Sequence, residues 1–229
     1  MLRRLAFIAP LIPAAGVAYA YMGRGSRNKF EYGGKMIPHP EKTAKGGEDA
    51  YYASKHVLAV ADGVGGWNEV GVDPALYSRK LCKNIEGIIA SNPTGLLKDP
   101  KTIITKAWMD NTEQGSSTLV VITLPEDEPR IYTSYVGDSG YCVLRPDNPL
   151  TPKTFSVLYA SEPQQRRFNY PMQLGWGRNG DHPSIALTYS HDIQDGDIII
   201  VGTDGLFDNI SPKNISTVVS DFQDRKSVV

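Results

Sequence analysis

Acidic residues stand beside glycine at the ends of apolar segments in three distant parts of this 229-residue sequence. Glu48 and Asp49 follow a Gly-Gly pair, whereas Asp62 and Asp204 each end an apolar run and precede a glycine. A carboxylate at the end of a strand, next to a glycine that lets the backbone approach closely, is a typical oxygen ligand of a hard divalent cation. We therefore expect the fold to assemble one metal site from these residues.

The segments that carry these residues have the patterns of short strands and amphipathic helices. Apolar runs and a period-two alternation predict strands at 50–54, 57–61, 118–124, 130–136, 141–145, 154–159, 185–189 and 197–203. Pairs of an N-cap residue and a proline predict helix starts at Asp73-Pro74, Asp99-Pro100 and Ser211-Pro212. Strands joined by tight turns, with helices grouped between them, predict an α+β fold rather than an alternating parallel fold.

The composition fits one domain of ordinary size, or one domain with an appendage. The sequence is 41% hydrophobic and 21% charged, which supports a substantial core. A net charge of −1 gives no argument for binding nucleic acid or an anionic membrane surface. Cys82 and Cys142 match no metal-binding spacing, so we expect free thiols in a reducing compartment.

The N-terminal segment 1–30 differs in kind, because it contains arginine and lysine but no Asp or Glu. Three interpretations compete. The acid-free composition is typical of a mitochondrial presequence, the apolar stretch 5–22 could anchor the chain in a membrane, and Ala18-Tyr19-Ala20 resembles a secretory cleavage site. We favour import into mitochondria, to the matrix or inner membrane, over another membrane-anchored or secretory location.

These features predict three parts of the chain. Residues 1–30 are expected to form a targeting presequence or a membrane anchor, with membrane attachment through residues 5–22. Residues 31–44, rich in Gly, Lys and Pro, are expected to form a linker. Residues 45–229 are expected to form the functional domain.

Several classes of reaction are excluded by missing motifs. The sequence contains no Gly-x-x-x-x-Gly-Lys-Ser/Thr phosphate loop and no Gly-x-Ser-x-Gly nucleophile elbow. Neither cysteine is followed by an arginine at the spacing of a cysteine phosphatase, and the glycines of 63–66 do not fit a dinucleotide fingerprint.

Five motifs together resemble the type 2C family of metal-dependent protein phosphatases. They occur in the order and rough spacing of that family and cover about residues 45 to 212: Gly47-Glu48-Asp49, Asp62-Gly63-Val64-Gly65-Gly66-Trp67, Gly115-Ser116-Ser117-Thr118, Val136-Gly137-Asp138-Ser139-Gly140 and Thr203-Asp204-Gly205-Leu206-Phe207-Asp208-Asn209. Many members have histidine where this chain has Val64. That valine, with Trp67 and the segment 71–74, resembles the mitochondrial subgroup.

The resemblance implies an antiparallel β-sandwich flanked by helices, with two Mn²⁺ or Mg²⁺ ions that activate a water to attack phosphoserine or phosphothreonine in proteins. Asp62 matches the carboxylate that bridges both ions, and Gly63 matches a backbone carbonyl ligand. Asp204 matches a further ligand, while Glu48 and Asp49 match groups that hold the second ion directly or through water. Lys45 stands near the basic residue that binds phosphate in the family.

Two departures from the family leave a second function open. Family members continue well past the Thr-Asp-Gly motif and supply one more metal-binding aspartate, whereas this sequence ends at Val229. The expectation is a domain incomplete at its C-terminus, either a truncated or processed product that binds metal weakly, or one completed from elsewhere. Val64 also cannot donate a proton to the leaving group. The alternative to an active phosphatase is a catalytically weak or inactive relative that binds phosphoproteins.

Overall fold

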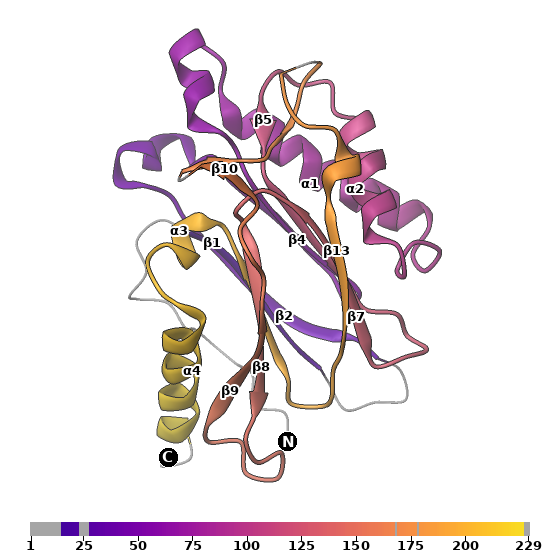
Figure 1. Ribbon diagram of the computed structural model, residues 1–229, viewed down its shortest axis with the longest axis vertical. Coiled ribbons are helices and arrows are strands. Elements are labelled where there is room, and N and C mark those ends of the chain that lie inside the picture. The colour runs from indigo at the N-terminus through magenta and orange to yellow at the C-terminus, as the bar shows by residue number, and fades with distance from the viewer. Residues whose placement is uncertain (1–14, 23–27, 168, 178, 227–229) are drawn as a thin grey trace.

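Two antiparallel sheets of five strands each form the centre of the fold (Figure 1). The computed structural model describes residues 15–22, 28–167, 169–177 and 179–226. In spatial order, the first sheet consists of β2 (Phe30–Ile37), β1 (Ala15–Met22), β14 (Ile198–Gly202), β8 (Gly140–Pro146) and β9 (Phe155–Ala160). The second sheet consists of β13 (Leu187–Asp192), β7 (Arg130–Val136), β6 (Leu119–Thr123), β4 (Val57–Asp62) and β3 (Asp49–Ala53).

Both faces of the central strands are buried, and alternate residues enter different cores. In β4, Leu58 and Val60 lie in the core between the sheets, whereas Val57 and Ala59 lie in the core under the helices. Because successive side chains of a strand point to opposite faces, a continuous apolar run satisfies both cores. The run 198–201 is divided in the same way between two cores. The apolar runs in the sequence therefore mark inner strands.

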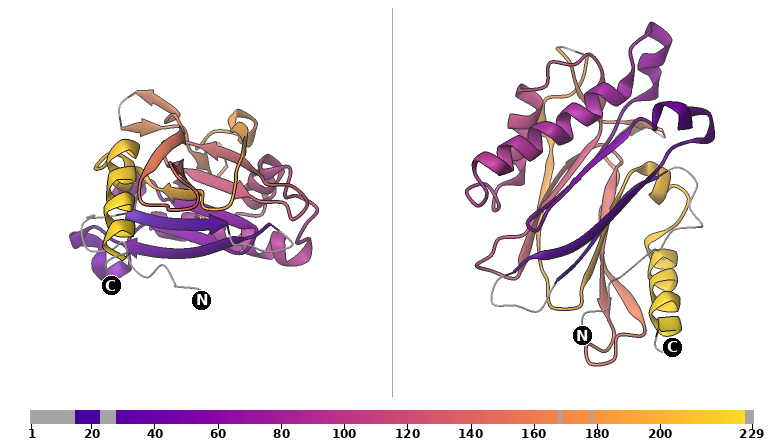
Figure 2. Two further views of the ribbon diagram at one scale, coloured as in Figure 1. Left: turned by 90° about the horizontal axis from the view of Figure 1, so that it is seen from below. Right: turned by 180° about the vertical axis from the view of Figure 1, so that it is seen from behind.

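Helices cover the outer faces of the two sheets, which gives four layers. α1 (Pro74–Ser91) and α2 (Pro100–Met109) pack on the second sheet, and α4 (Pro212–Lys226) packs on the first. Figure 2 shows α1 and α4 on opposite sides of the strands. α3 (Asp204–Phe207) follows β14 directly at one end of the sandwich. The predicted α+β sandwich flanked by helices is confirmed.

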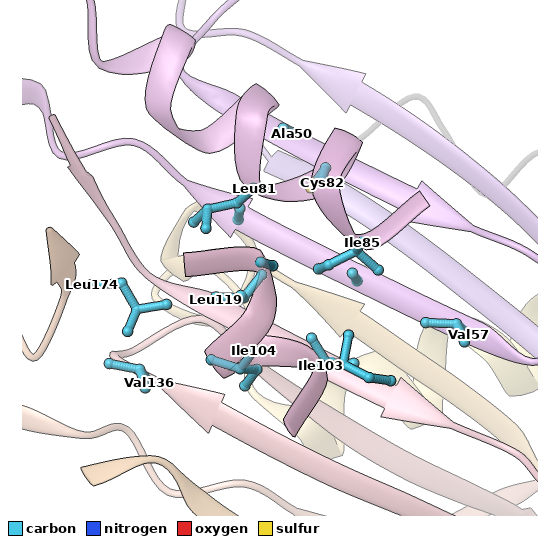
Figure 3. Close-up of a cluster of buried hydrophobic side chains, with 14 of the residues drawn as sticks. Ala50, Val57, Leu81, Cys82, Ile85, Ile103, Ile104, Leu119, Val136 and Leu174 are labelled. Carbon is cyan, nitrogen blue, oxygen red and sulfur yellow. The ribbon is translucent and has the colours of Figure 1, made fainter. Parts of the chain in front are cut away.

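Local sequence explains where the long helices begin and which face they bury. The side chains of Asp73 and Asp99 cap α1 and α2 by accepting hydrogen bonds from the backbone N–H groups of Ala75 and Thr102. Such caps stabilise a helix by about 1 kcal/mol. Leu81 and Ile85 of α1 meet the second sheet in the core drawn in Figure 3.

The N-terminal part of the fold differs from the predicted leader and linker. Strand β1 lies within 1–30 and pairs with β14 on one side and β2 on the other, while β2 occupies the first half of the predicted linker 31–44. Two adjacent glycines in β2 hid the strand from sequence reasoning. Gly34 is needed there, because a Cβ at this position would lie 2.6 Å from the ring of Tyr51. Among the described residues, no helix combines the length and apolar character needed to cross a bilayer.

The remaining elements are short and lie in the connections. Three brief strands lie in the connection after β9, namely β10 (Gln165–Arg167), β11 (Tyr170–Pro171) and β12 (Leu174–Gly175). β10 pairs with β11, and β12 pairs with β5 (Ser116–Ser117). The described part of the chain also contains the 3₁₀ helices η1 (Pro40–Lys45), η2 (Gly65–Val70) and η3 (Pro183–Ile185). Of these, η1 borders the candidate site.

Candidate active site

The antiparallel pairing of β3 and β4 brings two of the predicted acidic residues together. Asp49 is the first residue of β3, Asp62 is the last of β4, and the two are direct partners in the register. Directly opposed residues have Cβ atoms about 4.5–5.5 Å apart, and like charges in that position destabilise a sheet. This pairing therefore points to a counter-charge that both carboxylates share.

Asp204 reaches the same place from the other sheet. β14 ends at Gly202, and Asp204 opens α3, with Thr203 as its N-cap. The hydroxyl of Thr203 donates to Oδ2 of Asp49 over 3.4 Å, which ties the end of the first sheet to the edge of the second. α3 and segment 38–48 lie side by side at this end of the sandwich (Figures 1 and 2).

Asp62 lies at the electrostatic centre of the cluster. Burial raises its pKa well above the ordinary value, and the charges of Asp49 and Asp204 raise it further. Both neighbouring carboxyl groups are within hydrogen-bonding reach of Asp62, which favours its protonated form in the protein without metal. Asp138 also senses this cluster. Burial raises its pKa, and the charge of Asp204 raises it further. A hydrogen bond of 2.9 Å from Gln165 Nε2 acts in the opposite direction.

A cavity of about 140 Å³ opens over the carboxylates. Four of the six predicted site residues line it, namely Glu48, Asp49, Asp62 and Asp204. Its other described lining residues are Met36, Ile37, Pro38, His39, Lys42, Gly47, Thr203 and Gly205. The predicted convergence of distant acidic corners is therefore present in the structure.

Lys45 and Gly63, the two other predicted site residues, are not among the described residues that line the cavity. Lys42 lies there in place of Lys45 and forms an ion pair with Glu48 Oε2. The short helix η1 folds back on Glu48, and a residue six positions earlier thereby meets its carboxylate. Lys42 stands six residues before Glu48 and Lys45 stands three before it, and no local pattern in the sequence distinguishes the two lysines.

Glu48 is tied to neighbouring side chains through both carboxylate oxygens. Lys42 Nζ pairs with Oε2, and Asn68 Nδ2 donates to Oε1 over 2.7 Å. Its backbone oxygen accepts from Ser78 Oγ and from the N–H of Gly63, at 2.6 and 3.1 Å. In this arrangement Glu48 holds the loop and the lysine in place, whereas the other three acidic residues share the cluster.

Gly63 acts by letting chain segments pass close together. A Cβ on this residue would lie 2.6 Å from the carbonyl oxygen of Pro74 and 2.9 Å from that of Glu48. Real Cβ atoms do not approach backbone oxygens so closely. The glycine after Asp62 therefore fixes the distance between the end of β4, the start of α1 and the acidic pair.

The donor set fits hard divalent cations. The cavity holds four carboxylates, against one lysine that is already paired with Glu48. Oxygen ligands with this excess of negative charge suit Mn²⁺ or Mg²⁺. Among the described residues, no three His, Cys, Asp or Glu side chains already stand in ligand geometry, so the fit rests on the donors and on the raised pKa of Asp62.

Known proteins with similar sequences are protein phosphatases. Probable protein phosphatase 2C 55 of Arabidopsis thaliana is 40% identical over 193 residues, which cover 83% of this chain and 39% of that protein. The crystal structure of the photosystem II phosphatase PBCP is 35% identical, with a TM-score of 0.72, and covers 80% of this chain and 70% of the solved chain. The chain belongs to the type 2C protein phosphatase family.

Further comparisons agree with this type 2C assignment at the level of the fold. The catalytic domain of the serine/threonine phosphatase PstP, solved with two manganese ions, has a TM-score of 0.54 at 18% identity and covers 92% of this chain and 90% of that chain. At this identity the likeness shows the fold alone. No family model matches the sequence. The chain spans about four tenths of the length of the first curated type 2C relatives, at 39% and 43%.

Proposed function

We propose that this chain hydrolyses phosphoserine and phosphothreonine esters of proteins with the help of two divalent cations, Mn²⁺ or Mg²⁺. The observation that supports the proposal most directly is the convergence of Asp49, Asp62 and Asp204 from two sheets on one cavity, in a member of the type 2C family. When bound, such cations supply Lewis-acid chemistry that activates a water and neutralises phosphoryl charge.

The residues of the chain have separate tasks in this proposal. Asp49, Asp62 and Asp204 would hold the cations, and Thr203 orients Asp49 through its hydroxyl hydrogen bond. Lys42 Nζ, held at the cavity by Glu48, can meet a phosphoryl oxygen as a point charge. Met36, Ile37 and Pro38 also line the cavity, so its lining is not entirely polar.

Substitution of Asp62 tests whether phosphate release depends on the proposed site. Purified protein with excess Mn²⁺ should release phosphate from a phosphoserine peptide. Asp62→Asn should lower that rate by at least about 100-fold, because an amide cannot replace the central carboxylate as a ligand. Asp99→Asn is the matched control, since asparagine keeps the N-cap of α2 away from the cavity. Equal rates in the two variants would exclude the proposed site.

The same experiment examines the second candidate function. The engagement of both Glu48 carboxylate oxygens by Lys42 and Asn68 is the observation that favours a non-catalytic phosphoprotein-binding relative. Phosphopeptide binding to the wild-type chain without turnover at any Mn²⁺ concentration would support that alternative.

We also propose that the protein works in mitochondria, on the acid-free and Arg-bearing composition of residues 1–30. Because strand β1 begins at Ala15 and pairs within the sheet, the proposed import signal is confined to the residues before it, which lie outside the described ranges. A fluorescent protein fused after residue 14 should enter mitochondria. Delivery of this fusion to the secretory pathway or to another organelle would refute the proposal.

A further inference from the structure

A side-chain hydroxyl completes the strand ladder at Asp62. The antiparallel register of β4 and β6 ends at Val60 and Val120, and its next hydrogen-bonded step sets Asp62 opposite Thr118. The N–H of Thr118 donates to the oxygen of Asp62 over 3.0 Å, as in an ordinary ladder. The N–H of Asp62, however, donates to Oγ1 of Thr118 over 3.2 Å, while the carbonyl oxygen of Thr118 accepts from Ser117 Oγ over 2.7 Å.

The side chain of Thr118 is held by the turn after β7. A Cβ on Gly137 would lie 2.6 Å from Cγ2 of Thr118, so the turn packs directly on this methyl group. Oγ1 of Thr118 lies 2.6 Å from Oγ of Ser139 in the same turn. Both side chains are buried, so water does not compete for this hydroxyl pair.

Ser139 lies where the chain passes from one sheet to the other. β7 belongs to the second sheet and β8 to the first, and the turn that contains Ser139 joins them. The next residue, Gly140, pairs with Gly202 at the end of β14, two residues before Asp204. The hydroxyl pair therefore connects the backbone of Asp62 to the strand end that precedes Asp204.

We propose that Thr118 and Ser139 are positioning residues of the cation site, an inference that rests on the proposed function. Their hydroxyl pair sets the separation between the carboxylates of Asp62 and Asp204, and thereby the affinity for divalent cations. Neither hydroxyl residue is among the described residues that line the cavity, so each acts through the ligands. Removal of such supporting groups typically weakens metal binding by about 10–100-fold.

A second hydroxyl link between the sheets differs in one respect. Thr203 donates to Oδ2 of Asp49 over 3.4 Å, so this link uses a carboxylate that the cations also need. The contacts of Thr118 with Asp62 and Ser139 use no carboxylate oxygen. They can therefore hold Asp62 in place both before and after a cation binds.

Thr123 provides a matched control at the other end of β6. Its side chain is also buried, and its hydroxyl donates to the backbone oxygen of Leu97 over 2.6 Å. It pairs with Val57, at the end of β4 opposite to Asp62, and is not among the described residues of the cavity. Thr118→Val and Thr123→Val both replace a buried hydroxyl by a methyl group, so both should lower Tm.

Calorimetric titration with Mn²⁺ separates positioning from a general loss of stability. Thr118→Val should raise Kd by about tenfold or more, whereas Thr123→Val should keep Kd within about twofold of the wild-type value. Thr118→Ser retains the hydroxyl and should keep Kd near the wild-type value. Ser139→Ala should also raise Kd, and the double variant should bind no more weakly than Thr118→Val, because the two hydroxyl groups act as one unit.

The results separate failure of this inference from failure of the proposed function. If both valine variants raised Kd equally, the effect would follow stability alone and the positioning role would be overturned. A wild-type Kd in Thr118→Val would also overturn it and would leave the metal site intact. A wild-type chain that binds no Mn²⁺ would overturn the proposed function, and the role of the hydroxyl pair with it.

Hydrogen exchange of the Asp62 amide tests the contact in chelator, without metal or turnover. Thr118→Val should speed this exchange more than that of the other β4 amides, whereas Thr118→Ser and Thr123→Val should not. Unchanged relative exchange in Thr118→Val would overturn the inference, because the hydroxyl would then not hold Asp62. Ser139→Ala removes a single oxygen atom and decides the matter by its Kd for Mn²⁺ if Thr118→Val does not fold.

Discussion

At the scale of single residues, the Asp62 carboxylate is in an environment that disfavours its negative charge when no cation is bound. Its pKa is raised by burial and by two neighbouring carboxylates, so the charged form is disfavoured in the protein without metal. A bound cation would reverse that balance, since it attracts the same charges that repel one another. Metal binding and folding stability are therefore linked at this residue.

We predict that Asp62→Asn has opposite effects with and without Mn²⁺. The pKa of Asp62 is raised in the folded protein, so the protonated carboxyl group favours the folded state. This contribution to stability is fully present below the unfolded pKa of about 3.9, and it is lost as the pH rises through the folded pKa. Without metal near neutral pH, the variant should therefore be more stable than wild type. Its advantage should shrink as the pH falls and disappear below about pH 3, where the carboxyl group is protonated in both states.

With Mn²⁺ the order should be reversed. At a hundredfold excess over Kd, a bound ion adds about 2.7 kcal/mol to wild-type stability. For a domain of this size that free energy raises Tm by roughly 5–10 °C. Thermal melting of both proteins in chelator and in Mn²⁺ measures the effect, and equal stabilisation of the variant by Mn²⁺ would contradict the prediction.

At the scale of elements, local sequence predicted most of the strands and helices that hold the site. The alternation in 130–136 matches β7, and the Asp73-Pro74 pair marks the start of α1. The N-terminal strands could not be predicted in this way, because Gly34 in β2 is explained only by the ring of Tyr51 across the fold. A propensity scale does not contain such a contact.

The sequence likewise predicted those site residues that carry a local signal, and it did not predict those that the fold alone brings to the cavity. Asp49, Asp62 and Asp204 carry a local signal, since each stands at a strand end beside glycine or follows a glycine pair. The position of Lys42 at the cavity has no such signal, because it depends on how η1 folds back on Glu48.

Close packing around the loop after β4 gives a second prediction. Gly63→Ala should lower the stability of the protein by about 1–3 kcal/mol, because the added methyl group would meet the backbone oxygens of Pro74 and Glu48. It should also weaken stabilisation by Mn²⁺, since the end of β4 would move away from Asp49. Urea unfolding with and without Mn²⁺ measures both effects.

Gly66→Ala is the control in the same loop, because a Cβ at that position has no neighbour within 4 Å. Its stability should stay within about 0.5 kcal/mol of wild type. Similar losses in the two variants would show that flexibility of the loop, rather than the close approach at Gly63, decides the result.

At the scale of the whole molecule, the cluster depends on two sheets that are held face to face by the core between them. Asp49 and Asp62 belong to the second sheet and Asp204 follows a strand of the first, so any shift between the sheets would separate the carboxylates. β14, which precedes Asp204, lies between β1 and β8. The N-terminal strand therefore supports the site although it lies far from it in sequence.

Deletion of residues 1–22 should consequently impair folding, whereas deletion of residues 1–14 leaves every described strand pair in place. The longer deletion exposes the edge of β14 and removes the strand partner of β2, and unpaired edges promote aggregation. We expect a loss of more than about 4 kcal/mol or an insoluble product. Soluble yield and melting temperature of the two truncated proteins measure the difference. Equal stability of both would mean that β1 is dispensable for the fold, and residues 15–22 would again be candidates for a leader segment.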